Sequence, residues 1–193
     1  MARRKEFDQE QALTTAMKTF WSKGYEATSV QDLVDRMGVQ RGSLYGSFKD
    51  KQSLFLAAID RYDRVVVKEM LDILDEPGPG KEAIRRFFET KVKNDLRVGH
   101  PGGCFVTNSA VERALSDAAT AKMVRNVLGR LEAAFYRALV RAREAGEIDG
   151  DRDLRALARY LTNSTQGLSV MTKVCADRSV LTDIVNITLS VLQ

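Results

Sequence analysis

The positions of the prolines set the strongest limit on the fold of this 193-residue chain. All three prolines lie in two short breaks, Glu76-Pro77-Gly78-Pro79-Gly80 and Gly99-His100-Pro101-Gly102-Gly103. Because proline and glycine clusters interrupt helices, the long segments outside these breaks are free to be helical. No segment alternates apolar and polar residues between hairpin turns, as strands of a half-buried sheet would. The sequence therefore predicts an all-α protein.

Apolar residues recur at helical spacing in about nine segments, and several of these segments begin or end at a recognisable cap. In the first segment the aromatic residues Phe20 and Trp21 continue the apolar stripe, and we expect them in a core with Tyr25. The predicted segments are about 8–23, 30–37, a short one reaching residue 48, 50–74, one around 84–96, 104–115, 119–145, one from 154 onward, and a last one around 181–192.

The stretch from residue 28 to residue 51 has the pattern of a helix-turn-helix. Val30, Leu33, Val34 and Met37 form one apolar stripe, which Gly38 ends. Ser29 and Asp32 form a capping-box-like start, with Asp in place of the usual Glu or Gln. The second helix is unusually polar, and its glycine at position 42 lowers helix propensity, which indicates a close backbone approach to a phosphate or a base edge. The alternative is a solvated amphipathic helix in another kind of bundle.

Short motifs in this region closely resemble the TetR/AcrR family of transcriptional regulators. They are Gly24-Tyr25, Ala27-Thr28-Ser29-Val30, Gly38-Val39, Gly42-Ser43-Leu44-Tyr45, Phe48-Lys49-Asp50-Lys51 and Leu54-Phe55. The resemblance runs from about Phe7 to Tyr62. Many members carry an aromatic residue and a His before the Phe, where this chain has Gly46 and Ser47. The resemblance implies a helix-turn-helix DNA-binding domain over residues 1–50 and an effector-binding and dimerisation domain over residues 51–193.

Eight residues are candidates for contact with double-stranded operator DNA: Thr28, Gln40, Arg41, Gly42, Ser43, Tyr45, Ser47 and Lys51. Gln40, Arg41 and Ser43 are expected to read base edges, with Arg41 on a guanine. Thr28 and Tyr45 are expected on phosphates, and the resemblance adds Lys51 to them. The net charge of +4 permits nucleic-acid binding without requiring it. An arm formed by residues 3–5, all basic, is a further candidate, and a solvated start is its alternative.

The last predicted helix is apolar over more than one face, so it needs cover on two sides. Its own core supplies one side, and a second copy of the chain would supply the other. We therefore expect a homodimer through the last two helices, as the resemblance also implies. Packing inside a larger bundle is the alternative.

The resemblance further implies an effector pocket between the fourth and eighth helices, for a small molecule that the sequence does not identify. Its candidate lining residues are Tyr62, Phe88, Cys104, Phe105, Thr107, Asn108, Phe135, Gln166 and Met171. Residues 102–108 resemble the Gly-Cys-aliphatic segment of a TetR subgroup whose members sense electrophiles or small metabolites. Cys104 falls where a helix should begin, a position that favours a reactive thiolate. A buried structural cysteine is the alternative, and it is favoured.

Several function classes do not fit this composition. Two cysteines and one histidine are too few for a Cys/His zinc site, and no Ser-containing nucleophile elbow accompanies His100. We therefore expect no metal, no cofactor and no enzymatic activity. The basic start lacks an apolar segment after it, and no apolar run is long enough to cross a bilayer, so a cytoplasmic protein is expected. The interpretation is a ligand-responsive repressor; the alternatives are an effector-independent DNA binder or activator and a helical interaction module without DNA.

Overall fold

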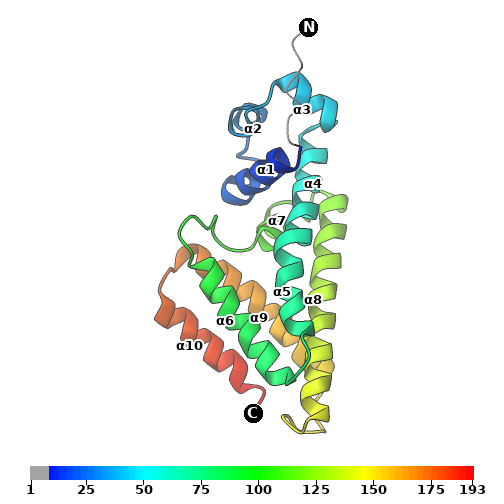
Figure 1. The fold of residues 1–193 in the computed structure, drawn as a ribbon, viewed down its shortest axis with the longest axis vertical. Coiled ribbons are helices and arrows are strands. Elements are labelled where there is room, and N and C mark those ends of the chain that lie inside the picture. Colours follow the sequence, from blue (N-terminus) through cyan, green and yellow to red (C-terminus); the bar gives the residue numbers. More distant parts are fainter. Residues whose placement is uncertain (1–8) are drawn as a thin grey trace.

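The computed structural model describes residues 9–193, and these residues form helices joined by loops, without strands. The molecule is elongated (Figure 1), with α1, α2 and α3 at one end and α6, α9 and α10 towards the other. We call α1–α3 the head and the remaining helices the body. The basic arm expected from residues 3–5 lies outside the described residues.

The helices agree closely with the predicted segments. If α4, the π-helical turn η1 and α5 are counted as one continuous helix, residues 9–193 contain nine helices, as expected. Their bounds are α1 Gln9–Lys23, α2 Val30–Met37, α3 Arg41–Ser47, α4 Lys51–Tyr62, η1 Asp63–Val67, α5 Lys68–Asp75, α6 Gly80–Asp95, α7 Phe105–Arg113, α8 Ala118–Glu144, α9 Leu154–Val174 and α10 Arg178–Ser190.

The caps predicted for the helix-turn-helix are present. The Ser29 hydroxyl accepts from the Asp32 backbone N–H at 3.0 Å, and the Asp32 carboxylate accepts from the Ser29 N–H at 2.9 Å. Gly38 ends α2 in the left-handed conformation at φ +65°, which glycine adopts without a steric penalty. Asp50 caps α4 by accepting from the Ser53 N–H at 2.7 Å. These local contacts fix the angles at which α3 and α4 leave the turn.

The long fourth helix departs from the prediction at its centre. The sequence predicts an uninterrupted α-helix over residues 50–74, whereas residues 63–67 form a π-helical turn. Three consecutive β-branched residues, Val65, Val66 and Val67, occupy this turn, and such residues are crowded in a regular α-helix. A π-turn inserts one residue and rotates the remainder of the helix about its axis, and such turns occur often at functional sites. Val66 and Val67 line a cavity of the body.

Two apolar clusters fill the interior. The lower cluster joins α5, α6, α8, α9 and α10 around Phe87, Phe88 and Phe135. The upper cluster joins the head to α4 and also includes Phe105 and Val124, from α7 and α8. Of the aromatic residues expected in the head core, Phe20 and Trp21 are buried there, with Leu33, Leu44 and Phe48, whereas Tyr25 is only half-buried against the cluster. The head therefore packs directly on the upper end of the body.

No helix within residues 9–193 is both long enough and apolar enough to cross a membrane.

Candidate functional site

The surface predicted to contact DNA is the outer face of α3. Gln40, Arg41, Gly42 and Ser47 are exposed, as is Tyr45, and Ser43 is half-buried. The opposite face holds α3 in place, because Leu44 is fully buried and Phe48 directly after the helix is nearly so. Figure 1 shows α3 at the end of the molecule remote from α10. This arrangement presents a short polar helix outward on an apolar base, as entry into a major groove requires.

Two further residues of the predicted DNA surface have different surroundings. Lys51 is half-buried in the first turn of α4, with its ammonium 4.2 Å from the centre of the Tyr25 ring. Thr28 is fully buried; its hydroxyl donates to the Gly24 carbonyl, and its backbone N–H donates to the Tyr25 carbonyl. Both hydrogen-bond donors of Thr28 are thus used within the head, so its contact with a phosphate remains a prediction that would require one of these bonds to be exchanged.

The α7 helix ties the head to the body through a set of polar contacts that sequence reasoning missed. The Glu112 carboxylate accepts from the backbone N–H groups of Tyr25 and Glu26, both at 2.9 Å. Arg113 forms an ion pair with Glu26 at 2.7 Å, and its guanidinium lies 4.3 Å from the centre of the Tyr25 ring. The turn between α1 and α2 is therefore held from outside, by residues more than eighty positions away in the sequence.

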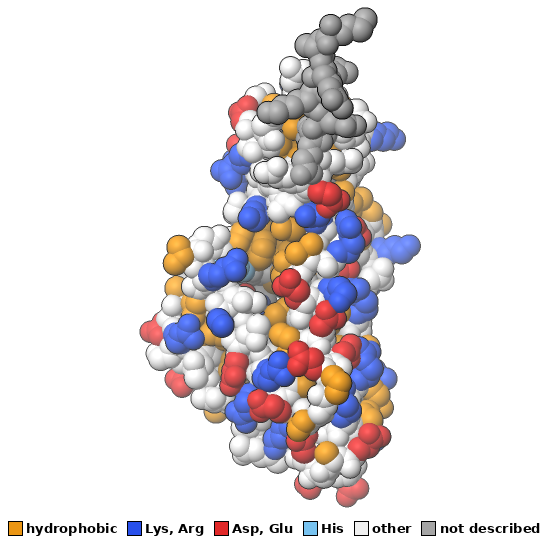
Figure 2. Space-filling view, in the orientation of Figure 1, with side chains coloured by type: hydrophobic (Ala, Val, Ile, Leu, Met, Phe, Trp, Pro, Cys, Tyr) orange, Lys and Arg blue, Asp and Glu red, His pale blue; other side chains and the backbone are white. Residues whose placement is uncertain are grey.

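A cavity of about 90 Å³ lies between the head and the lower cluster. Its walls come from the end of α4, from η1, α5, α6, α7, α8 and α9, and from the loop before α7. The lining residues are Tyr62, Val66, Val67, Met70, Leu71, Phe87, Lys91, Asn94, Asp95, His100, Cys104, Val106, Val127, Leu128, Leu131, Thr165, Gln166 and Ser169. In the space-filling view of Figure 2, hydrophobic side chains gather below the head, with Lys and Arg around them.

Three of the nine predicted pocket residues line this cavity: Tyr62, Cys104 and Gln166. Three others, Phe88, Phe105 and Phe135, are core residues that are almost completely buried outside its wall. Phe87 takes the place expected for Phe88, because neighbouring positions on α6 point in directions about 100° apart.

The three remaining predicted pocket residues also lie outside the wall, and two of them support it. The Thr107 hydroxyl donates to the Gln166 side-chain oxygen at 2.6 Å. The Asn108 oxygen accepts from the Lys173 ammonium at 3.3 Å. Met171 packs against the lower apolar cluster.

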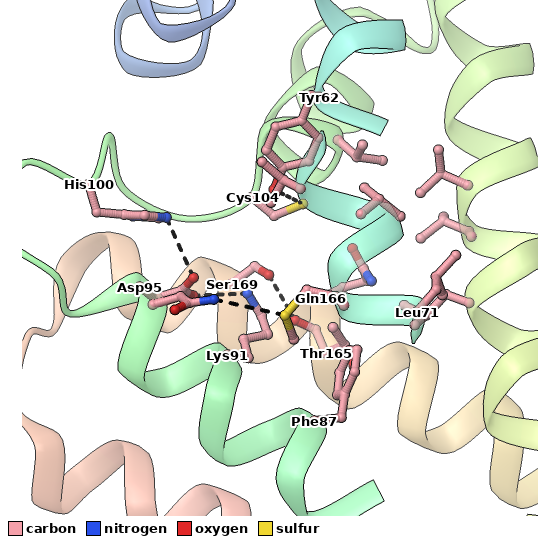
Figure 3. Close-up of a pocket in the computed structure, with 18 residues that line it drawn as sticks. Tyr62, Leu71, Phe87, Lys91, Asp95, His100, Cys104, Thr165, Gln166 and Ser169 are labelled. Carbon is pink, nitrogen blue, oxygen red and sulfur yellow. Dashed lines mark hydrogen bonds and ion pairs between the residues drawn. The ribbon is translucent and has the colours of Figure 1, made fainter. Parts of the chain in front are cut away.

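One end of the cavity is polar, and its residues were not predicted (Figure 3). Asp95 accepts from Lys91 at 2.9 Å and from the Thr172 hydroxyl at 2.9 Å, both through the same carboxylate oxygen, Oδ2. Its other oxygen, Oδ1, faces His100 Nε2 at 3.7 Å. The side chains of Lys91, Asp95 and His100 are only 10%, 7% and 12% exposed. A signal was available in the sequence, because Lys91 continues the apolar stripe of Ile84, Phe87 and Phe88 at helical spacing.

Burial is the main cause of the pKa shifts of His100 and Tyr62, the two titratable side chains beside this end. Burial lowers the pKa of His100, as do Lys91 and Arg97 nearby, while Asp95 partly offsets them. The imidazole therefore favours its neutral form. Burial also raises the pKa of Tyr62 well above its ordinary value, and the Tyr62 hydroxyl donates to the Cys104 Sγ at 3.4 Å. Cys104 stands at the N-cap of α7, as expected, with its half-buried thiol on the cavity wall.

Trp21 joins the cavity to the head. Its indole N–H donates to the Gly102 carbonyl at 3.1 Å. Its ring meets the edges of two cavity residues, with ring centres 4.7 Å from His100 and 4.9 Å from Tyr62. Trp21 belongs to α1, so a buried side chain of the head lies directly against the cavity wall.

No group of three or more His, Cys, Asp or Glu side chains in the described part of the chain is arranged to hold a metal ion.

The last two helices expose apolar side chains, which are Tyr160, Val170 and Val174 on α9, and Val180 and Ile187 on α10. These positions lie on the helices predicted to form the dimer.

Two sequence families match this chain. "Bacterial regulatory proteins, tetR family" matches residues 12–58, and "Tetracyclin repressor-like, C-terminal domain" matches residues 80–187. The first covers the head and most of α4, and the second covers α6 through most of α10.

Among proteins with similar sequences, the uncharacterized HTH-type transcriptional regulator YezE of Bacillus subtilis is 40% identical over 193 residues, which cover 100% of both chains. The HTH-type transcriptional repressor ComR of Escherichia coli is 32% identical, covering 97% of this chain and 90% of its own length. A solved structure of a cysteine mutant of the TetR family transcriptional regulator CifR, in complex with 26-bp double-strand operator DNA, superposes with a TM-score of 0.90. It is 27% identical and covers 99% of this chain and 100% of its own. The family matches, these similarities and the fold agree: the chain belongs to the TetR family of bacterial transcriptional regulators.

Proposed function

We propose that this TetR-family regulator is a repressor that binds a palindromic operator as a homodimer and is released by a small-molecule effector. The observation that carries the proposal is the position of Trp21, which contacts both the cavity wall and the interior of the head. The relatives support the DNA-binding half of the proposal: ComR is named a repressor, and the CifR structure contains operator DNA. On this proposal the protein acts in the cytoplasm, by binding and without catalysis.

The outer face of α3 would read the operator. Gln40, Arg41 and Ser43 stand at the start of the helix, where side chains reach base edges, and Arg41 fits the bidentate contact with a guanine. Tyr45, Ser47 and Lys51 would position the head on phosphates, which fixes register without reading sequence. Gly42 would allow the backbone to approach the DNA closely.

The homodimer would form through α9 and α10, whose exposed apolar side chains need cover. Two-fold symmetry makes such an interface self-complementary and gives the operator matching half-sites. The two heads would then enter successive major grooves, about 34–36 Å apart. The division into a DNA-binding domain of residues 1–50 and an effector domain of residues 51–193 is part of this proposal. The ring of Trp21, in the DNA-binding domain, packs on the ring of His100, in the effector domain, so a shift of one domain would displace the other.

An effector in the cavity would act through its different affinity for two arrangements of the head, because a ligand shifts an equilibrium only by that difference. Displacing His100 or Tyr62 would move Trp21 and, with it, α1. The Cys104 thiol on the cavity wall extends the class of effectors to thiol-reactive molecules. Cys104→Ser should abolish the response to such a molecule and leave the response to a reversible ligand intact.

The decisive experiment is a selection of random duplex DNA on the purified protein, read by sequencing. We expect enrichment of a palindrome with half-sites about one helical turn apart. Absence of enrichment at low salt would contradict DNA binding and leave a helical interaction module as the function. A recovered palindrome that no compound in a metabolite screen releases would favour an effector-independent DNA binder or activator.

A further inference from the structure

We infer that the ligand of the cavity is a small, uncharged molecule with a short apolar body and one head group that both donates and accepts a hydrogen bond, such as an alcohol or a primary amide. The inference deepens the proposed function, since it names the chemical class of the effector. It rests on the size of the cavity, on its apolar walls and on the arrangement of Asp95 and His100 at its polar end.

The size of the cavity limits the ligand first. Its volume is about 90 Å³, whereas sites for drug-sized ligands usually measure roughly 300–1,000 Å³. The cavity is nevertheless larger than the minimum for one water molecule, roughly 10–15 Å³. In this conformation the site therefore accommodates a molecule of only a few heavy atoms.

The walls require most of that molecule to be apolar. Val66 and Leu71 approach from η1 and α5, Phe87 from α6, and Leu128 and Leu131 from α8. A polar group placed against these side chains would lose its hydrogen bonds to water without replacement. The hydrogen-bonding part of the ligand therefore belongs away from these side chains, and we place it beside Asp95 and His100 (Figure 3).

That end brings together a donor on His100 and an acceptor on Asp95 that do not satisfy each other. His100 Nδ1 accepts from the Gly102 backbone N–H at 3.2 Å, which places the proton of the neutral imidazole on Nε2. Nε2 is 3.7 Å from Asp95 Oδ1, too far for a hydrogen bond. A hydroxyl or a primary amide beside both atoms would accept from Nε2–H and donate to Oδ1. An ether or a hydrocarbon would make at most one of these bonds.

The charge of this end excludes ions. Lys91 and Asp95 form a buried ion pair, so each of these two charges already has its partner. His100 adds no charge in its favoured form, because burial lowers its pKa. A carboxylate would be placed beside Asp95, and an ammonium would remain close to Lys91. Burying either charge without a free counter-ion costs far more than burying a neutral group.

The test uses the full-length protein and five four-carbon probes that differ only in the head group: butan-1-ol, butanamide, butanoate, butylammonium and methyl propyl ether. Affinities come from titration calorimetry at neutral pH. The fluorescence of Trp21, the only tryptophan of the chain, provides a second readout, since its ring contacts His100. We expect the alcohol and the amide to bind about tenfold to a hundredfold more tightly than the other three probes. Equal or tighter binding of an ion or of the ether, or no binding of the alcohol and the amide, would overturn the inference.

Variants separate the head-group contacts from general packing. His100→Phe keeps a ring against Trp21 but removes the Nε2 donor, so the alcohol, the amide and the ether should each lose one hydrogen bond and bind more weakly. The matched control is Val98→Ala in the same loop, where the side chain is fully exposed and these affinities should not change. Asp95→Asn keeps an oxygen acceptor but leaves Lys91 without its partner, so butanoate should gain affinity relative to the alcohol. Unchanged affinities in His100→Phe, or an unchanged ranking of the probes in Asp95→Asn, would contradict the assignment.

Failure of the inference can be distinguished from failure of the proposed function. A recovered operator that is released by some larger or charged compound, while the neutral probes do not bind, would overturn the inference and leave the regulator intact. Neutral probes that bind as expected but leave operator affinity unchanged would support the ligand class and contradict its role as the effector.

Discussion

The outer face of α3 and the polar end of the cavity both carry polar and charged side chains. Those of α3 are largely exposed to solvent, whereas those of the cavity are nearly buried. Arg41 is exposed on α3, and the packing of the helix depends on Leu44 behind it. Asp95, by contrast, is nearly buried and is held by Lys91 and the Thr172 hydroxyl. On the proposed function, α3 can therefore change its reading of DNA at little cost to the fold. The cavity cannot change without disturbing the packing around it, and this coupling is what a sensor requires.

The same substitution in the two regions should have opposite effects on stability. Gly103, next to the cavity residue Cys104, has φ +63°, and a methyl group there would lie 2.8 Å from the Ser169 carbonyl oxygen. Gly103→Ala should therefore lower the free energy of unfolding by about 2–4 kcal/mol, from backbone strain and overpacking together. Gly42 is in α3, and a methyl group there meets no described atom within 4 Å. Gly42→Ala should raise the free energy of unfolding by up to about 1 kcal/mol, the difference in helix propensity.

Urea denaturation of both variants measures this contrast, and operator titration adds a second result. Gly42→Ala should weaken operator binding while stabilising the free protein, if the backbone of α3 approaches the DNA. Stronger operator binding by this variant would remove that explanation for the glycine. A stable Gly103→Ala protein would contradict the close packing of the loop on α9.

Replacing the exposed arginine of α3 should affect binding alone. Arg41→Ala is expected to weaken operator binding by about 1–3 kcal/mol and to relax specificity at one base pair. Its thermal unfolding should match that of the parent protein, because the side chain is exposed. The measurement is a titration against the selected operator and against versions altered at single positions. An unchanged preference at every position would exclude Arg41 from base reading.

The contact between head and body should affect both stability and binding. Glu112→Ala removes the acceptor for the backbone N–H groups of Tyr25 and Glu26, and should cost about 1–2 kcal/mol of stability. It should also weaken operator binding, because the turn between α1 and α2 loses its external support. Glu112→Gln keeps one acceptor oxygen, so its stability and its operator affinity should lie between those of the parent protein and those of Glu112→Ala. Glu144→Ala, at an exposed end of α8, is the control and should resemble the parent.

The head was largely predictable because its signals are local. Ser29 and Asp32 are three positions apart, and Gly38 ends the helix that they begin, so the cap could be recognised from residue types within about ten positions. The same reasoning placed Thr28 on a phosphate. That prediction did not foresee that its hydroxyl would bond to the Gly24 carbonyl within the buried turn. The spacing of residue types along the sequence identifies a helix and its caps. It does not show which polar groups will form hydrogen bonds within the head itself.

The cavity was predictable only in outline because its residues meet across long separations. Trp21 and Gly102 are 81 positions apart, and no local pattern indicates that they form a hydrogen bond. The choice between Phe87 and Phe88 depends on the rotation of α6 about its axis, which tertiary packing sets. The π-turn at residues 63–67 shifts the register of the long helix in a way that apolar periodicity alone does not reveal.

The smallest expected effect belongs to Lys51, which lies at the start of α4, where the head joins the body. Its ammonium lies against the Tyr25 ring, a contact that would orient it towards a phosphate without holding it there. Lys51→Ala should weaken binding to all duplexes alike and reduce the slope of log affinity against log salt by about one. The measurement is the affinity of the parent protein and of the variant for operator and for random DNA over a range of salt concentrations. Equal slopes would assign Lys51 to the packing of the head, where Arg113 already lies near the same ring.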